Sequence, residues 1–300
     1  MSAWEFACPR CGGVLTAVTP HTLTCPHDNL TFTQIEGIWR LLLPERAAHF
    51  QQFITEYETV RQAEGWGSQQ AGYYRALPQV PADDPFAAIW HIRARSFQAL
   101  TAQVLGEPPL RILDLGAGNG WLSHRLAQLG HEVAAVDVLT NGVDGLGAMR
   151  HYEVAFTAVQ AEFDHLPFAP HQADLVIFNG SFHYTADYEQ TLVMVKRVLR
   201  ANGRMVIMDS PIYHNAASGQ QMVAERAAAF AQEHGFRGDV LPHEGFMTFG
   251  RLAELAQTMS LRWHFIKPAY GWRWAVRPWL ARLRRHREPA TFLLVVGEFV

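Results

Sequence analysis

The chain has 300 residues, of which 49% are apolar and 18% are charged, and this composition excludes a disordered or low-complexity protein. The formal net charge is −3, from 28 acidic and 25 basic residues, so the whole chain has no electrostatic drive toward nucleic acid or anionic membranes. At this length we expect one large domain with a small attachment.

The cysteines and the apolar runs indicate in which cellular compartment the protein is expected. No run of about 18 apolar residues occurs, so we expect no membrane span. Residues 1–13 lack the basic start and apolar run of a secretory signal peptide. Cys8, Cys11 and Cys25 are odd in number and clustered, which favours metal ligation in a reducing compartment over disulfides. These features together predict a cytoplasmic protein.

The first third of the chain reads as a small β module followed by helices. Residues 1–43 alternate apolar and polar side chains around two Cys-Pro turns, which indicates short hairpins. Residues 44–64 begin with proline and predict a helix, and residues 65–85 are rich in glycine and proline and predict a loop. Residues 86–105 predict a second helix with one apolar side.

From residue 110 onward, short apolar runs alternate with helical stretches. This alternation predicts a mainly parallel, doubly wound α/β sheet. The expected strands are Arg111–Leu115, Glu132–Val136, a weaker one near Ala155–Val159, Leu175–Asn179, Arg204–Asp209, Leu261–Ile266 and Thr291–Phe299.

A glycine-rich turn follows the first of these strands. In the run RILDLGAGNGW, the glycines are Gly116, Gly118 and Gly120, and such a turn lets a ligand approach the backbone closely. A dinucleotide fingerprint requires G-x-G-x-x-G, whereas Trp121 occupies the last glycine position here. Asp114, at the strand end, would also repel a pyrophosphate. The pattern therefore disfavours a nicotinamide dinucleotide.

The run from Asp114 to Gly120 resembles the first motif of class I S-adenosylmethionine-dependent methyltransferases of the type 11 kind, and further markers follow in order. The resemblance implies a Rossmann-like, seven-stranded, mainly parallel sheet with helices on both faces. It also implies that S-adenosylmethionine is the cofactor and S-adenosylhomocysteine the product. By resemblance, Asp137 accepts the ribose hydroxyls, Glu162 accepts from the adenine amino group, and Phe163 lies beside the ring. The full implied cofactor set is Tyr74, Asp114, Gly116, Ala117, Gly118, Asn119, Gly120, Asp137, Val138, Glu162, Phe163 and Asn179.

The same resemblance predicts the division of the chain. Residues 1–43 form a zinc-ribbon-like module, residues 44–105 a helical segment that caps the cofactor pocket, and residues 106–300 the methyltransferase domain. Residues 210–250 are expected to form a lid over the acceptor. Tyr74 belongs to the capping segment, although an aromatic that merely fills a gap is an equal alternative.

The cysteine cluster resembles the paired knuckles of a zinc ribbon. Cys8 and Cys11 form one knuckle and Cys25 begins the second, but no fourth cysteine follows. Asp28 stands at the fourth-ligand position of that alignment, and His27 is one residue earlier. Both residue types bind zinc, and a degenerate ribbon without metal is the alternative.

Candidate catalytic residues follow the fourth and fifth strands, where the acceptor lies in this fold. Tyr213 and His214 are the candidate bases, whereas His183 falls in a segment where family members carry histidine for packing. In-line attack on a sulfonium methyl requires proximity and alignment, and a base only when the nucleophile must lose a proton.

Residues 271–287 hold six arginines and three tryptophans without an acidic residue. The simplest interpretation is a solvated helix face on which arginine stems cover tryptophan; an RNA-contacting surface and a membrane-interface helix are the alternatives. For the whole chain we expect methyl transfer to a small organic acceptor. The alternatives are an RNA methyltransferase whose ribbon holds the RNA, which the net charge disfavours, and a non-catalytic module that binds S-adenosylmethionine.

Overall fold

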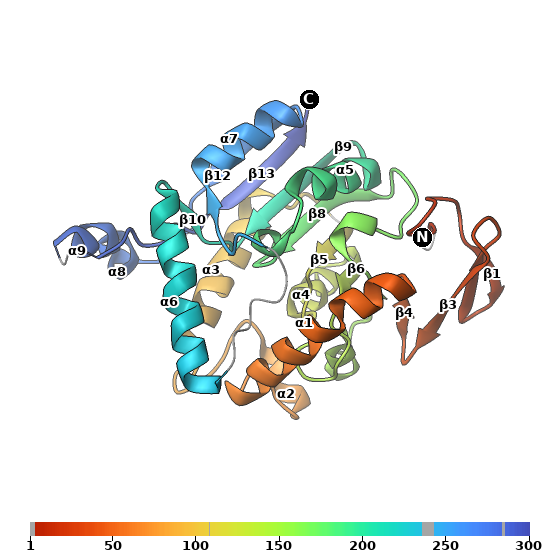
Figure 1. Cartoon of the computed structure of the whole chain (residues 1–300), viewed down its shortest axis with the longest axis horizontal. Coiled ribbons are helices and arrows are strands. Elements are labelled where there is room, and N and C mark those ends of the chain that lie inside the picture. Colours follow the sequence, from red (N-terminus) through yellow and green to blue (C-terminus); the bar gives the residue numbers. More distant parts are fainter. Residues whose placement is uncertain (1–3, 108, 236–242, 284–285) are drawn as a thin grey trace.

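The computed structural model of the protein describes residues 4–107, 109–235, 243–283 and 286–300 (Figure 1). The N-terminal module is an antiparallel meander in which each strand pairs with the next. Its strands are β1 (Thr16–Thr19), β2 (Thr22–Cys25), β3 (Leu30–Ile35) and β4 (Ile38–Arg40). This agrees with the short hairpins expected from the alternating pattern.

Three helices then lead to the main sheet. They are α1 (Pro44–Ala63), α2 (Ala71–Ala76) and α3 (Ala87–Gln103). The ranges of α1 and α3 match the expected helices closely. By contrast, α2 lies inside the stretch predicted to be a loop. Burial of the Tyr74 ring at its centre stabilises this short helix, which its flanking glycines and prolines do not predict.

The main sheet has the strand order β7-β6-β5-β8-β9-β13-β12. Its strands are β5 (Arg111–Leu115), β6 (Glu132–Asp137), β7 (Thr157–Gln160), β8 (Ala173–Asn179), β9 (Leu199–Met208), β12 (Leu261–Ile266) and β13 (Leu294–Phe299). All pairs from β7 to β9 are parallel, and β13 runs antiparallel to both neighbours. The expected Rossmann-like sheet of seven strands is therefore confirmed.

The N-terminal module is continuous with this sheet. Strand β4 pairs in parallel with β7, with Ile38 opposite Ala158, so that one sheet of 11 strands results. The backbone N–H of Leu41 extends the pairing by donating to the Gln160 carbonyl at 3.0 Å. Sequence alone predicted only that the module precedes the main domain. Pairing at this edge covers the unsatisfied backbone groups that β7 would otherwise present.

Helices pack on both faces of the sheet. Further helices are α4 (Trp121–Gln128), α5 (Tyr188–Val198), α6 (Ala216–His234), α7 (Phe249–Thr258), α8 (Trp272–Ala275) and α9 (Arg277–Leu283), with 3-10 turns at Leu146–His151, Phe163–His165 and Phe182–Tyr184. A small parallel pair, β10 (Ile212–Tyr213) and β11 (Met247–Thr248), lies outside the main sheet.

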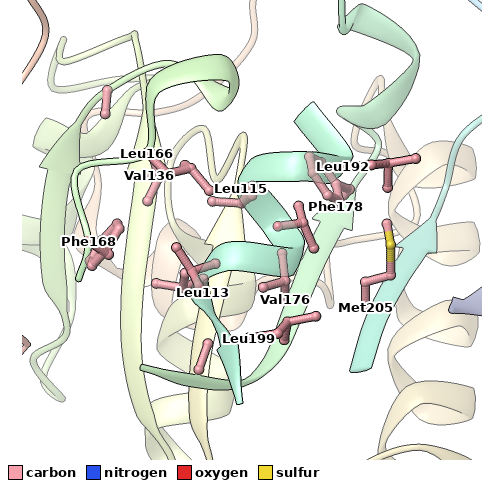
Figure 2. Close-up of a cluster of buried hydrophobic side chains, with 14 of the residues drawn as sticks. Leu113, Leu115, Val136, Leu166, Phe168, Val176, Phe178, Leu192, Leu199 and Met205 are labelled. Carbon is pink, nitrogen blue, oxygen red and sulfur yellow. The ribbon is translucent and has the colours of Figure 1, made fainter. Parts of the chain in front are cut away.

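The core is divided by the sheet, because successive residues of a strand point to opposite faces. Leu113, Leu115 and Phe178 belong to the cluster shown in Figure 2, on the face covered by α5. Ile112 and Ile177, their chain neighbours, belong to the cluster on the opposite face, with α3 and α4. Burial of both faces explains the near-continuous apolar runs of β5 and β8.

Candidate functional site

The loop after β5 forms the floor of the candidate site. Gly116, Gly118 and Gly120 all have positive φ, at 76°, 55° and 76°. The backbone N–H groups of Gly116 and Ala117 donate to the Val136 carbonyl at 2.8 and 3.1 Å. A Cβ on Gly116 would lie 2.3 Å from the Cβ of Ser181, so only glycine fits there. This turn carries the backbone across the carboxyl ends of β5 and β6.

Asp137, the last residue of β6, stabilises the same loop. Its Oδ2 accepts from the Gly118 N–H and its Oδ1 from the Leu139 N–H, both at 2.8 Å. Burial raises the pKa of Asp137 to about 6, while these backbone hydrogen bonds act in the opposite direction. Each carboxylate oxygen keeps acceptor capacity for a ligand hydroxyl.

A pocket opens above this loop at the carboxyl edge of the parallel strands. Its lining includes most of the cofactor-binding residues implied by the resemblance, namely Gly116, Ala117, Gly118, Asn119, Asp137, Val138, Glu162, Phe163 and Asn179. The buried Oδ1 of Asn179 has no hydrogen-bond partner among the described residues. An unpaired acceptor beside a glycine-rich loop fits a ligand that offers a hydrogen-bond donor and that lies close to the backbone.

Helix α1 forms the opposite wall of the pocket. Arg46, Phe50, Phe53, Tyr57 and Arg61 all line it. Their spacing places them on one face of a helix, and no residue of α1 is fully buried. Sequence analysis assigned a capping role to this segment without identifying these residues. The recurrence of aromatic side chains along one face of α1 was the signal that could have found them.

Two arginines of α1 connect this wall to the main domain. Arg46 donates to both oxygens of Glu162, with Nη2–Oε2 at 2.6 Å and Nε–Oε1 at 2.8 Å. Arg61 pairs through its Nε with Oδ2 of Asp144 at 2.5 Å. The helix is therefore held against the pocket by ion pairs to the loops that follow β6 and β7.

The comparisons with known proteins identify the main domain. Residues 113–207 match a family described as "Methyltransferase domain". This part of the chain is a class I S-adenosylmethionine-dependent methyltransferase domain. The matched segment of the methyltransferase domain runs from β5 to β9, and it contains the glycine loop, Asp137 and Glu162.

Individual relatives agree on the domain and cover only part of either protein. An uncharacterized methyltransferase of Mycobacterium tuberculosis is 31% identical over 140 residues, which are 47% of this chain and 49% of the relative. A malonyl-[acyl-carrier protein] O-methyltransferase of Hahella chejuensis is 30% identical over 44% of this chain and 52% of its own length. The chain thus spans about half the length of the curated relatives it matches.

Among solved structures, an S-adenosylmethionine-dependent methyltransferase from Mesorhizobium loti is 20% identical, with a TM-score of 0.49. The comparison covers 68% of this chain and 97% of that protein.

Three residues of the predicted cofactor set lie outside the pocket lining of the methyltransferase domain. Asp114 is fully buried behind the loop, where its Oδ2 accepts from the Ser123 hydroxyl at 2.7 Å. Gly120 begins α4 in a left-handed conformation. Tyr74 is fully buried, and its hydroxyl oxygen lies 2.7 and 2.6 Å from the carbonyl oxygens of Ser68 and Val143. The alternative interpretation of Tyr74, a packing role, agrees with this position.

The three candidate catalytic residues also lie outside the pocket lining. His183 is buried, its Nδ1 lies 3.1 Å from the Ser210 hydroxyl, and burial lowers its pKa to about 3. Tyr213 is buried against Phe246, and burial raises its pKa. The His214 ring stacks on Phe249 at 4.4 Å. Their proximity to the acceptor was inferred from chain order alone, whereas the structure buries the side chains of His183 and Tyr213 outside the pocket lining and leaves His214 exposed.

The expected acceptor lid, residues 210–250, contributes no described residue to the pocket lining, and residues 236–242 lie outside the described part of the chain. Tyr184, Thr185 and Ala186 from the turn after β8 line the pocket beside α1. The position of α3 adds Arg93, which sequence analysis did not single out.

The cysteine cluster forms a compact set of potential metal ligands. One ligand atom from each of Cys8, Cys11, Cys25 and Asp28 lies within 4.8 Å of the others. Three thiol sulfurs and one carboxylate oxygen are a donor set that zinc accepts in four-coordinate sites. The His27 side chain is 81% exposed and touches the cluster only through a 3.0 Å contact between Nδ1 and Asp28 Oδ1. Of the two candidates for the fourth ligand, Asp28 belongs to this compact set of ligand atoms.

No described helix is both long and apolar enough to cross a membrane.

Proposed function

We propose that the protein transfers the methyl group of S-adenosylmethionine to a small organic acceptor. The observation that carries this proposal is the convergence of the glycine loop, Asp137 and Glu162 on one pocket of a methyltransferase domain. S-Adenosylmethionine supplies a methyl group on a sulfonium, which is an activated leaving group. Asp137 and Glu162 would hold the ribose and adenine, and the glycine loop admits the backbone contact.

The acceptor is proposed to carry a carboxylate, and Arg93 is the residue that supports this choice. Arg93 lines the pocket from α3, and its guanidinium lies 4.5 Å from the centre of the Trp90 ring. Within the described residues no ion pair engages it. Burial lowers the pKa of Arg93, and the nearby charge of Asp209 opposes that effect. A guanidinium that stacks on tryptophan is suited to bind a planar carboxylate in two-point fashion.

A carboxylate acceptor would also need no general base, although His49 lines the pocket from α1. A carboxylic acid is ionised near neutral pH and attacks without a general base. Tyr57, which lines the pocket, has its pKa raised by burial and is a poor base. The chain's contribution would then be to align and desolvate the acceptor against the sulfonium. The name of the Hahella chejuensis relative, which specifies O-methylation of a malonyl group, supports this class.

The test is formation of S-adenosylhomocysteine from S-adenosylmethionine, with a panel of short mono- and dicarboxylic acids and their thioesters. We expect turnover with at least one acid, and none with the corresponding amide. The Asp137→Ala variant serves as the control deficient in cofactor binding. Binding of S-adenosylhomocysteine without turnover on the acids or on a metabolite extract would contradict the proposal and favour a non-catalytic module.

Arg93→Gln distinguishes the acceptor's carboxylate from the carboxylate of the cofactor itself. If Arg93 binds the acceptor, KM for the acid rises about tenfold or more while the affinity for S-adenosylhomocysteine is unchanged. A loss of affinity for S-adenosylhomocysteine, with unchanged affinity for methylthioadenosine, would assign Arg93 to the cofactor and contradict its acceptor role.

We further propose that the N-terminal module binds one zinc ion through Cys8, Cys11, Cys25 and Asp28. The close approach of these four ligand atoms supports it. A tetrahedral site with four protein ligands leaves no open position, which is typical of structural rather than catalytic zinc.

A further inference from the structure

The segment that follows β7 carries the candidate adenine contacts of the pocket. Residues 161–169 contain Glu162 and Phe163, which both line the pocket, and the buried Leu166 and Phe168. Figure 2 shows Leu166 and Phe168 among the side chains of the hydrophobic cluster on the α5 face. The N-terminal module and the start of α1 contact this segment at both ends and at Glu162.

The end of the segment pairs with the residues that precede the first candidate metal ligand. The N–H of Ala7 donates to the Pro167 carbonyl at 3.1 Å, and the N–H of Ala169 donates to the Glu5 carbonyl at 2.9 Å. Cys8 directly follows Ala7 in the chain. The backbone of the adenine-binding segment is therefore paired with backbone that lies one residue from a thiol of the cysteine cluster.

Side chains extend this contact into a continuous core. The Phe168 ring packs against the rings of Trp4 and Phe6, with ring centres 5.4 and 5.6 Å apart. Cys8 and Cys25 are almost fully buried and belong to the same hydrophobic cluster as Phe168. Because a close-packed core transmits a change in volume or order to its neighbours, loosening of the cysteine cluster would remove packing from the Phe168 side chain.

The other end of the module holds the start of the segment and leads into α1. Strand β4 pairs in parallel with β7, and the Leu41 N–H donates to the carbonyl of Gln160. In the first turn of α1, Arg46 donates to both oxygens of Glu162. Glu162 thus lies between two stretches of backbone that the module contacts, and its own carboxylate is held by the helix that follows the module.

The size of the module makes its order dependent on more than its own apolar residues. It spans residues 4–43, and chains of about 40 residues usually need a metal, disulfides or association to fold. A structural metal supplies free energy of folding to such modules. The cysteine cluster brings four ligand atoms within 4.8 Å of one another. Filling this site would therefore stabilise residues 5–8, which hold the adenine-binding segment.

We propose that the N-terminal module is a positioning element for the cofactor: metal bound at the cysteine cluster keeps Glu162 in place, and loss of the metal lowers the affinity of the pocket for the adenosine part of the cofactor. This inference rests on the proposed metal site and on the proposed adenine contact of Glu162. It gives the module control over methyl transfer, because metal loss would weaken cofactor binding while the seven strands from β7 to β12 keep their own pairings.

The test is calorimetric titration of the full chain, loaded with zinc or stripped by a chelator, with S-adenosylhomocysteine and with methylthioadenosine. Stripping should weaken both ligands about tenfold or more, the scale of a lost hydrogen bond to a charged group, because both carry the adenosine part. Added zinc should restore both affinities. Hydrogen exchange at the Ala169 N–H should become faster in the stripped protein, since this group loses its Glu5 partner.

Phe6→Ala weakens the contact between module and segment without changing a metal ligand. It should keep the zinc and weaken both ligands about two- to tenfold, the scale of one aromatic pair. The matched control is Phe265→Ala, which removes a half-exposed ring from β12, at the opposite edge of the sheet. This control should bind both ligands like the parent protein. Should stripping unfold the main domain as well, Phe6→Ala decides, because it retains the metal.

The outcomes separate this inference from the proposals on which it rests. Absence of zinc from the parent protein would overturn the metal site and this inference with it. A zinc-loaded protein that does not bind S-adenosylhomocysteine would overturn the proposed function. Bound zinc whose removal leaves both affinities unchanged would overturn this inference alone. A loss for S-adenosylhomocysteine with unchanged affinity for methylthioadenosine would also overturn it, because the effect would then lie at the amino-acid end of the cofactor.

Discussion

The Arg46 guanidinium and the Glu162 carboxylate form a bidentate ion pair across the pocket, with Nη2–Oε2 at 2.6 Å. Arg46 Nε lies 2.8 and 2.9 Å from the two Glu162 oxygens, and His165 Nδ1 lies 3.0 Å from Oε1. A carboxylate has about four acceptor positions, and three N–H groups reach Glu162, because the single Nε–H of Arg46 is shared between the two oxygens. An adenine amino group can take the remaining position or replace the most exposed of these donors.

We predict that the adenine displaces His165, because its side chain is 40% exposed and can turn into solvent. Glu162→Gln should then weaken S-adenosylhomocysteine binding by about 1.5–3 kcal/mol, the scale of hydrogen bonds to a charged group. His165→Ala should not weaken it. Calorimetric titration measures both. A loss in His165→Ala as large as that in Glu162→Gln would show that the histidine itself contacts the cofactor.

Asp137 gives a second prediction for cofactor binding. Asp137→Ala should weaken S-adenosylhomocysteine binding by about 2–3 kcal/mol, because the ribose hydroxyls lose a charged acceptor. Asp137→Asn keeps one oxygen that can accept from a backbone N–H, so its affinity for S-adenosylhomocysteine should fall less. Calorimetry with a circular dichroism control separates binding from loop damage. Unchanged affinity in Asp137→Ala would contradict the ribose assignment.

The glycine loop predicts a contrast between two alanine variants. Gly116→Ala should lower the free energy of unfolding by about 2–4 kcal/mol, because its Cβ would meet Ser181 at 2.3 Å in a left-handed conformation. The nearest atom to a Cβ on Gly118 is the Asp144 carbonyl oxygen at 3.5 Å. Gly118→Ala should therefore cost only the conformational strain, about 1–2 kcal/mol. Urea unfolding measures both, and equal losses would contradict the steric argument.

Asp114 predicts a pH-dependent stability. Burial raises its pKa from 3.8 to about 7, despite the hydrogen bond from Ser123. The folded state therefore binds more protons than the unfolded state between about pH 4 and pH 7, and this residue lowers stability as the pH rises through that window.

Asp114→Asn removes this titration. Its stability relative to the parent protein should increase from about pH 4 to pH 7 by up to about 4 kcal/mol, and then level off. Urea unfolding without cofactor at several pH values tests this. Asp137 also titrates in both proteins, and its charge is one of the causes that raise the pKa of Asp114. A difference that does not change with pH would show that Asp114 is ionised throughout the window.

The metal proposal predicts about one zinc per chain in protein purified without chelator. Cys8→Ser and Asp28→Ala should lose the metal, whereas His27→Ala should keep it, because the His27 ring lies outside the ligand cluster. Chelation should melt the N-terminal module before the main domain. Elemental analysis and thermal unfolding give the readouts. Metal lost in His27→Ala and kept in Asp28→Ala would reverse the assignment of the fourth ligand.

Local residue patterns are sufficient to predict the main sheet and the place of the glycine loop. Buried parallel strands require continuous apolar runs, and a left-handed turn requires glycine at Gly116, so both features are written in neighbouring residues. Expected strands such as Arg111–Leu115 and Leu261–Ile266 match the observed ones. Methyltransferase family membership followed from motifs of the same local kind.

The rest of the site depends on contacts between residues that are distant in the chain. The pair of Arg46 with Glu162 joins positions 116 residues apart, and the pairing of β4 with β7 joins the module to the far edge of the sheet. Chain order could not show that His183, Tyr213 and His214 lie outside the pocket lining while Arg93 contributes to it. Side-chain direction after a strand is set by turn geometry and by the packing of distant elements, and neither has a local signature in the sequence.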